Sequence, residues 1–574
     1  MPRAESSQTV AGTVTAGSAL GRTLIALTLL LLFGSFATEI GDTDFWWNLA
    51  TGRYIAQEHE LPVPDPFSYT SDRGDEAYPG ERRVRNFNLT HEWLAQLLGY
   101  GVWVVSGFAG LVLLKSALLT FFCGAAGWLA WRRSGSLVAG AVAAVVGMPF
   151  LLLFASDRPA LLTFAFVALF TLILERYRES GQVRWLYVLP LLQILWANMH
   201  GGFFMGFVVL GAYFLDALRK QARRNALGAT LAAAVVLSGL NPSGFGIFAV
   251  LSGYRQSFLT QTLIEWAQPP LWGPPYVFQL LLYATAAVMA WQWRRVRVCD
   301  ALLFVAFGAA SLLAFRNLPF VAFFAPVFLA TYAPGVRRLD LRTAAGAVAG
   351  VIAALLVWQA ANGKLFQLRV ADWKFPEQAA HLLRQTGPEH PLFNTYEYGG
   401  YLMWAVGPEQ EVFIDGRALN EAVYADYRTI LYGDPNDPIA AQRLLDHYDV
   451  DVVLMNGFEY VSGVVYPLIL RLGAPSNAQW RLAYQDAQAV VFVREGSGAL
   501  PGMSLAKSGV TEHLEASCRL SVEHDAELSQ CARTLGFLYL RAGDAERARA
   551  ALELYLSAWP YGDPEAEQAL ARLR

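Results

Sequence analysis

Charged side chains are scarce in this 574-residue sequence: Asp, Glu, Lys and Arg together make up 16% of it, whereas hydrophobic residues make up 55%. This balance excludes an ordinary soluble protein and indicates a polytopic membrane protein. The basic residues are dispersed among short segments rather than gathered in one patch, which excludes nucleic acid as a partner.

Cysteine is also rare. The four cysteines, Cys123, Cys299, Cys518 and Cys531, do not have the spacing of a metal-binding motif. A disulfide between Cys518 and Cys531 is possible in an oxidising compartment, although nothing in the sequence requires it.

What the sequence has in abundance is apolar segments of membrane-spanning type. We predict a polytopic α-helical membrane protein of about 11 spans, followed by a C-terminal soluble α/β domain and a short helical-repeat tail. The apolar segments cover residues 24–37, 107–131, 136–155, 159–175, 185–198, 202–217, 225–240, 276–293, 299–315, 317–333 and 343–361.

The charge distribution predicts how these spans are oriented. Residues 1–361 carry 26 Lys and Arg against 19 Asp and Glu, whereas residues 362–574 carry 18 against 28. Basic residues fall in alternate loops, which the positive-inside rule places in the cytoplasm. The remaining loops, and everything after residue 361, then face outward. The basic loops are 132–133, 176–184, 219–224, 294–297 and 337–342.

The predicted domains follow from these changes in composition. We expect a disordered cytoplasmic N-terminus over 1–19, a transmembrane domain over 20–361 with an outward loop at 39–91, an α/β domain over 362–500, and a linker with helices over 501–574. In the α/β domain we expect a helix at 376–385 and strands at 411–414, 450–455 and 489–493. The linker is expected near 496–510.

Residues 529–572 resemble one tetratricopeptide unit. The residues at that repeat's offsets are Leu535, Gly536, Tyr539, Ala548 and Pro560. A single unit cannot bury its own apolar face, so it is expected to pack on flanking helices or on a protein partner.

The most informative stretch follows the first apolar segment, where Glu39, Asp42 and Asp44 precede Trp46 and Trp47. Carboxylates at a membrane boundary are costly unless they face water, a metal or a polar partner. On an extended or loop backbone, the aspartates at 42 and 44 could point to one side and either share a cation or divide the roles of base and positioner. The alternative is a solvated helix end with an aromatic anchor.

Several other polar residues fall in the loops assigned to the outward side. Arg158 and Arg316 suit a lipid phosphate. The His91-Glu92 pair and His200 suit acid/base or metal chemistry. Glu265 could belong to a loop that covers the site. Each has a simpler alternative. The arginines could snorkel to lipid headgroups, and His200 could be hydrogen-bonded at a helix end. Glu92 could be an acidic residue at a helix start, and Glu265 could lie in a surface connection. These residues are Asp157, Arg158, Asn198, His200, His91, Glu92, Glu265 and Arg316.

The arrangement resembles the GT-C superfamily of integral membrane glycosyltransferases, and within it the bacterial branch related to protein O-mannosyltransferases and aminoarabinose transferases. The resemblance covers about residues 20–361 and is architectural. The segments 393–402 and 413–417 are similar to the tails of bacterial members. The aspartates here are followed by Phe45-Trp46-Trp47, and nothing in the sequence specifies the sugar or the acceptor.

The resemblance implies an enzyme of the bacterial inner (cytoplasmic) membrane, with its C-terminal domain extracytoplasmic. Its partners would be a polyprenyl-phosphate sugar donor, an envelope acceptor (protein, lipid or polysaccharide) and membrane lipid. It implies Asp44 or Asp42 as the base, and Arg158 and Arg316 at the carrier phosphate. If a divalent metal ion is used, the candidate ligands are Asp42, Asp157 and His200.

A transporter or flippase for a lipid-linked or anionic substrate is the alternative, because similar polar groups could line a path. Such a protein should show internal repeats and polar residues near mid-membrane. The sequence shows no clear repeat, and its polar groups gather at one boundary, which favours the enzyme.

Overall fold

The computed structural model describes residues 14–573, except 221–222, 249, 251–263, 386, 388 and 418. The chain forms two compact units. Unit 1 contains residues up to 42, 55–61 and 87–370, and unit 2 contains 43–54, 62–86 and 371–574. The first outward loop was expected to belong wholly to the transmembrane domain, but two of its segments are part of unit 2.

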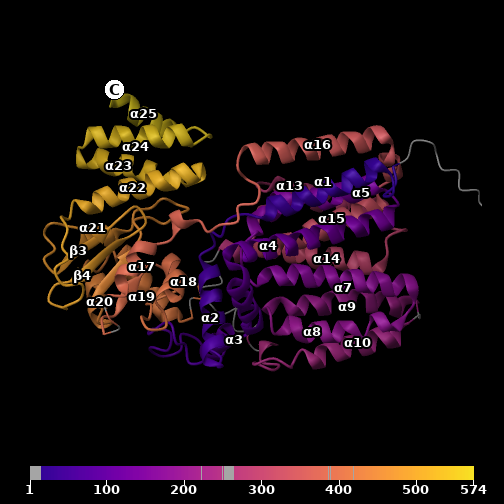
Figure 1. The fold of residues 1–574 in the computed structure, drawn as a ribbon, viewed down its shortest axis with the longest axis horizontal. Coiled ribbons are helices and arrows are strands. Elements are labelled where there is room, and N and C mark those ends of the chain that lie inside the picture. Colours follow the sequence, from indigo (N-terminus) through magenta and orange to yellow (C-terminus); the bar gives the residue numbers. More distant parts are fainter. Residues whose placement is uncertain are drawn as a thin grey trace, which may run out of the picture. The chain divides into compact units, whose positions relative to one another are not determined.

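Unit 1 is a bundle of apolar helices that run side by side (Figure 1). Within the described residues, seven helical segments are long and apolar enough to cross a bilayer, and four shorter apolar ones accompany them. These coincide with the eleven predicted segments. The helices are α1 (Ala19–Phe36), α4 (Trp93–Ser134), α5 (Leu137–Val145), α6 (Met148–Leu151), α7 (Ala160–Ser180), α8 (Val188–Ala197), α9 (Phe204–Lys220), α10 (Arg224–Leu237), α13 (Tyr276–Trp291), α14 (Val298–Leu313), α15 (Leu318–Tyr332) and α16 (Arg342–Ala361).

Short 3-10 helices lie at the ends of several of these elements. They are η1 (Leu152–Phe154), η2 (Val183–Trp185), η3 (Gly201–Phe203), η4 (Ile264–Trp266), η5 (Phe315–Asn317) and η6 (Val336–Asp340). The first outward loop contains α2 (Asp44–Glu58) and α3 (Glu81–Thr90). Between these two helices, residues 59–80 contain no helix.

One end of the bundle is held together by buried ion pairs. Arg133, at the end of α4, pairs with Asp300 of α14, which also accepts a hydrogen bond from the Tyr332 hydroxyl. Arg297 Nη1 lies 3.4 Å from Glu175 Oε1 at the end of α7. These contacts bring basic loops that are far apart in the sequence to a common end, as the orientation prediction requires.

The long helix α4 is interrupted at Gly107, whose φ of 63° lies in the left-handed region. In the part of α4 before it, Val104 and Val105 are exposed. From Lys115 to Arg133 the helix rises about 27 Å, close to the thickness of a bilayer core of about 30 Å. Only this second part of α4 therefore has to span the membrane.

The N-terminal segment is ordered from residue 14, which corrects the prediction of disorder for its last residues; residues 1–13 lie outside the described part. Val14 is buried and its N–H donates to Asp340 O at 2.8 Å. Ser18 caps α1 by accepting from Gly21 N at 3.1 Å.

Unit 2 is built on a four-stranded sheet of order β1-β2-β4-β3, formed by β1 (Leu392–Asn394), β2 (Val452–Met455), β3 (Trp480–Gln485) and β4 (Val490–Arg494). The first pair is parallel and the others are antiparallel. The helices are η7 (Asp372–Lys374), α17 (Glu377–Leu383), α18 (Tyr396–Ala405), α19 (Glu421–Tyr432), α20 (Ala440–His447), α21 (Pro467–Leu472), α22 (Gly509–His524), η8 (Ala526–Ser529), α23 (Gln530–Ala542), α24 (Ala545–Ala558) and α25 (Pro564–Arg572).

The predicted strand at 411–414 is wrong, because this segment makes only an isolated bridge, between Val412 and Ser68. Its carbonyls and amides bond to side chains instead: Phe413 N donates to Asn394 Oδ1 at 2.8 Å. The edge strand that pairs with β4 on the side away from β2 is β3, which the sequence did not predict. Its burial follows no simple alternation, and its register shifts between Leu482 and Tyr484.

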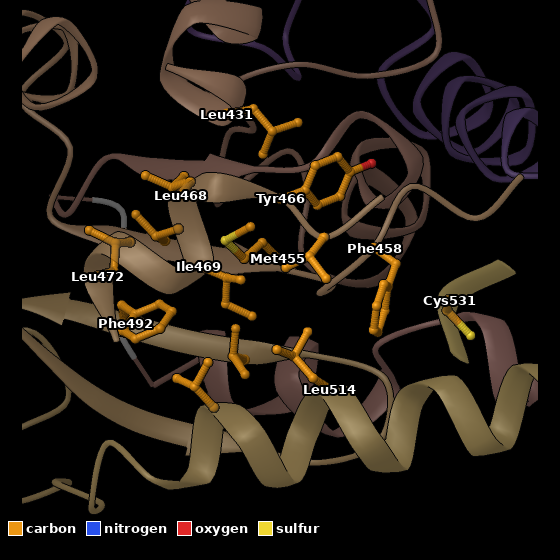
Figure 2. Packing of buried hydrophobic residues seen from close by; sticks show 14 of the residues in the cluster. Leu431, Met455, Phe458, Tyr466, Leu468, Ile469, Leu472, Phe492, Leu514 and Cys531 are labelled. Carbon is orange, nitrogen blue, oxygen red and sulfur yellow. The ribbon is translucent and has the colours of Figure 1, made fainter. Parts of the chain in front are cut away.

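The C-terminal helices share one hydrophobic core with the sheet rather than following a free linker. Figure 2 shows Leu514 of α22 pointing into a cluster with Ile469 and Phe492. The segment before α22 is attached to β3, where Leu505 N donates to Leu482 O at 2.7 Å. Residues 496–510, predicted as a linker, are thus part of the domain.

The last three helices form an antiparallel arrangement in which Gly536 of α23 lies close against Leu552 of α24. A disulfide joins Cys518 of α22 to Cys531 of α23. The segment 529–572 therefore packs on a flanking helix, which is one of the two arrangements expected for a lone repeat. Its assignment as a tetratricopeptide unit stays a prediction.

Candidate functional site

Unit 1 contains a bidentate ion pair between Asp42, which follows α1, and Arg158, which precedes α7. Arg158 Nε and Nη2 donate to the two carboxylate oxygens of Asp42 at 2.6 and 3.0 Å. Its Nη1 donates to Glu265 Oε1 in η4 at 2.7 Å. The Arg158 side chain is 30% exposed, so it can be reached from solvent. This geometry fixes the guanidinium as well as neutralising it.

Next to this pair lies a buried one. Lys115 Nζ donates to Asp157 Oδ2 at 3.0 Å and to both the hydroxyl and the carbonyl of Thr38 at 2.9 Å. Within the described residues, Asp157 Oδ1 is buried without a hydrogen-bond partner. Burial raises the pKa of Asp157 to about 7, against the attraction of Lys115 and with the help of the Asp42 charge. A carboxyl that titrates near neutrality with an orphan oxygen is typical of a functional site.

This raised pKa predicts a pH-dependent stability. Because the folded protein keeps the Asp157 proton at pH values where the unfolded chain has lost it, the group's contribution to stability is lost as the pH rises from 3.8 towards 7. The melting temperature of the wild type, relative to that of Asp157→Asn, should therefore fall over this range. Thermal unfolding of both purified proteins across a pH series measures it.

The matched control is Glu39→Gln, which removes a carboxylate paired with the exposed Arg369 at 2.9 Å. Its profile should run parallel to that of the wild type, because a surface pair contributes little. Parallel profiles for the wild type and Asp157→Asn would contradict the assignment.

A second polar group contains His91, Glu92 and His200. Glu92 Oε1 lies 3.3 Å from His91 Nε2 and 3.6 Å from His200 Nε2. His91 Nδ1 donates to Phe87 O at 3.1 Å, so its Nε2 can also donate to Glu92 only when the ring carries both protons. The Glu92 carboxylate thus lies between the imidazole rings of His91 and His200.

The tautomer of His200 follows from its other contacts. Its Nδ1 accepts from Gly202 N at 2.9 Å and faces the Thr163 hydroxyl at 2.8 Å, which leaves the proton on Nε2. Burial lowers the pKa of His200 to about 4, against the attraction of Glu92. His200 is therefore neutral at physiological pH, and its Nε2 faces Glu92 Oε1 at 3.6 Å, too far for a hydrogen bond.

Arg316 is connected to the Arg158 group through η4. Its guanidinium lies 4.6 Å from the ring centroid of Trp266, the neighbour of Glu265, which binds Arg158. The charge of Arg316 also contributes to the lowered pKa of His200. The short helix η4 thus contacts both of the arginines that are predicted to bind phosphate.

Asn198 is engaged within the protein. Its Oδ1 accepts from Trp93 Nε1 at 2.8 Å, and its Nδ2 donates to Ile194 O and Leu240 O at 2.9 and 2.8 Å. Its carbonyl also accepts from Leu94 N at 3.2 Å. These contacts tie the start of α4 to the end of α8; substrate binding by Asn198 stays a prediction.

Asp44 belongs to unit 2 and is the first residue of α2. Its carbonyl accepts from Asn48 Nδ2 at 2.9 Å. A Cβ added at Gly416 would lie 1.9 Å from Asp44 Oδ1, so this close approach requires glycine. A helix begins at Asp44, whereas Asp42 lies before it and outside any helix. The hypothesis that the two side chains point to one side stays a prediction.

The residues present do not fit the suggested metal site. Within the described part of the chain, no three His, Cys, Asp or Glu side chains gather to hold an ion. Asp42 is neutralised by Arg158, Asp157 by Lys115, and the lone pair of His200 Nδ1 is used by Gly202 and Thr163. The positive charge at this site comes from arginine and lysine.

Two residues of the site were missed by sequence reasoning. Lys115 is a charge inside an apolar segment, which is a functional signal in itself. Thr163, which orients His200 and accepts from Trp196 Nε1 at 3.0 Å, gave no signal, because threonine is common in such helices.

The apolar bundle with its C-terminal mixed domain has the GT-C fold, which is found in solved membrane glycosyltransferases. The Archaeoglobus fulgidus oligosaccharyltransferase has this fold: its apo form matches with a TM-score of 0.51 and 12% identity over 94% of this chain and 86% of that one. The same enzyme, AglB, in complex with an inhibitory peptide and a dolichol-phosphate matches with a TM-score of 0.52 and 12% identity, over 95% and 86%.

ArnT from Cupriavidus metallidurans in the apo state matches at a TM-score of 0.47, with 13% identity over 83% of this chain and 98% of that one. No family model matches the sequence, and no curated protein matches it. At these identities the likeness shows the fold alone. The chemistry has to be inferred from the residues of this chain.

Proposed function

We propose that this protein is a glycosyltransferase that moves a sugar from a polyprenyl-phosphate-linked donor to an envelope acceptor at the outer face of the bacterial inner membrane. The observation that carries the proposal is the solvent-reachable Asp42–Arg158 pair beside the buried Lys115–Asp157 pair. A base next to fixed cations is what transfer from a lipid phosphate requires. The shared fold with a dolichol-phosphate-binding enzyme supports it.

In the proposed reaction a carboxylate, Asp42 or Asp44, accepts the proton of an acceptor hydroxyl. The oxygen attacks the anomeric carbon, the bond from that carbon to the phosphate oxygen breaks, and its electron pair leaves with the polyprenyl phosphate. Arg158 and Arg316 stabilise the charge that develops on the phosphate. Glu92 and His200 position the loop between α8 and α9.

The test is transfer by the purified full-length protein in liposomes. The probes are undecaprenyl-phosphate carrying radiolabelled mannose, glucose or arabinose, with an envelope extract as acceptor. We expect label from at least one donor to enter protein, lipid or polysaccharide with release of undecaprenyl phosphate. Movement of intact donor between leaflets without cleavage of any probe would instead support a flippase and overturn the proposal.

The proposed orientation has its own test. The Cys518–Cys531 disulfide favours an oxidising compartment for unit 2. A membrane-impermeant thiol reagent on spheroplasts should label Ala542→Cys, an exposed position at the end of α23, and should not label Arg295→Cys, an exposed position in a basic loop. The native free cysteines, Cys123 and Cys299, are buried. The reverse labelling would contradict the orientation.

A further inference from the structure

Unit 1 has an apolar groove of about 780 Å³ between α1, α4 and α7 that the proposed reaction does not use. Along α4 it extends from Ala117 to Trp128, which is about 16 Å at the rise of an α-helix. That length is about half of a bilayer core of roughly 30 Å, which is enough for one acyl chain. Its lining includes Phe33 of α1, Ala117, Gly124 and Trp128 of α4, Arg176 of α7, and Trp185.

One end of the groove is basic and aromatic. Arg176 lies 5.8 Å and Arg184 5.7 Å from the ring centroid of Trp185, and Arg132 lies 5.8 Å from that of Trp128. A single acidic residue, Glu179, contacts Arg132 and Arg176, at 3.6 and 3.7 Å. Three arginines against one carboxylate leave an excess of positive charge among exposed side chains. Tryptophan with arginine at a membrane boundary is suited to lipid headgroups.

At the other end of the groove, the described residues offer no comparable site for an anion. There Ser116 Oγ donates to Phe33 O, and Lys115 is already paired with Asp157 and Thr38. Charge complementarity therefore places an anionic headgroup at the Arg176 end and its chain along the groove. This is the end where the basic loops gather, opposite to Asp42.

We propose that this groove is a binding site for one anionic phospholipid of the cytoplasmic leaflet. Its phosphate lies against Arg132, Arg176 and Arg184, and one acyl chain lies between α1, α4 and α7. Because α1 leads into Asp42 and α7 follows Arg158, the lipid stabilises the helices that hold the proposed site from the opposite membrane face.

The test is native mass spectrometry of the delipidated full-length protein titrated with phosphatidylglycerol or with phosphatidylcholine of identical acyl chains. We expect one phosphatidylglycerol to bind at least tenfold more tightly than phosphatidylcholine. The double variant Arg176→Gln/Arg184→Gln should lose affinity for it by roughly thirtyfold, as two cations near an anionic headgroup are removed. The control Arg294→Gln removes a cation that lies 5.3 Å from the ring centroid of Trp293, away from the groove, and should bind as the wild type does.

A second pair of variants tests the groove itself. A Cβ at Gly124 meets nothing within 4 Å, so Gly124→Leu introduces its side chain from open space at the groove lining, and Gly346→Leu makes the same change from an equally open position on α16. Only the first should abolish phosphatidylglycerol binding. Equal binding of the two lipids, unchanged binding by Gly124→Leu, displacement of the lipid by undecaprenyl phosphate, or a dimer that Gly124→Leu dissociates would each overturn the proposal.

Discussion

Replacing Asp42 by Asn is expected to lower glycosyl transfer by roughly a hundredfold or more, which is the loss that removal of a general base produces. The change keeps the size of the side chain but removes the charge that Arg158 contacts with two nitrogens. Arg158 would keep its contact with Glu265, so its position should be largely retained. The initial rate with the labelled undecaprenyl-phosphate donor measures the effect.

Asp44→Asn is measured beside it, because either aspartate can be the base, and one of the two should show the larger loss. Glu39→Gln is the control, since this carboxylate lies in the same segment and pairs with the exposed Arg369. If both Asp42→Asn and Asp44→Asn transfer sugar at the wild-type rate, the acidic stretch is only a membrane anchor and the enzyme proposal is contradicted.

Replacing Arg417 by Met is expected to destabilise unit 2 by about 3–5 kcal/mol, the usual cost of leaving buried charges without their partner. Arg417 Nη1 and Nη2 bind the two oxygens of Asp65 at 3.1 and 3.0 Å, and its Nε and Nη2 bind those of Asp415 at 2.7 and 2.8 Å. All three side chains are at most 3% exposed. Two buried carboxylates would then face each other. Resistance of the C-terminal region of the full-length protein to protease in urea measures the loss.

Two further variants make this result specific. Arg443→Met breaks an exposed pair with Asp437 and should cost at most about 1 kcal/mol. Adding Asp65→Asn and Asp415→Asn to Arg417→Met removes the unpaired charges and should restore most of the resistance. If the triple variant is as labile as Arg417→Met alone, lost packing and not charge explains the effect.

The candidate site shows how far local reasoning reaches. Arg158, Glu265 and Arg316 were predicted on one side of the membrane from loop charges, and the structure joins them through η4. The helix that begins at Asp44 was not predicted, because composition alone could not distinguish a helix from a loop after the acidic stretch. The strand predicted at 411–414 failed because its polar groups are satisfied by side chains such as Asn394, which belongs to another segment.

The sequence by itself determined the spans and the resemblance to a fold, because the length and hydrophobicity of an apolar segment are local properties of the chain. The orientation that the loop charges indicate stays a prediction. Only the tertiary structure decided which charges meet. Asp42 pairs with Arg158 across 116 residues and Asp65 with Arg417 across 352. Such pairing depends on which helix and sheet faces pack together, and packing is set by the summed contacts of the whole chain. The same reason explains Lys115, whose place in an apolar helix makes sense only beside Asp157 and Thr38.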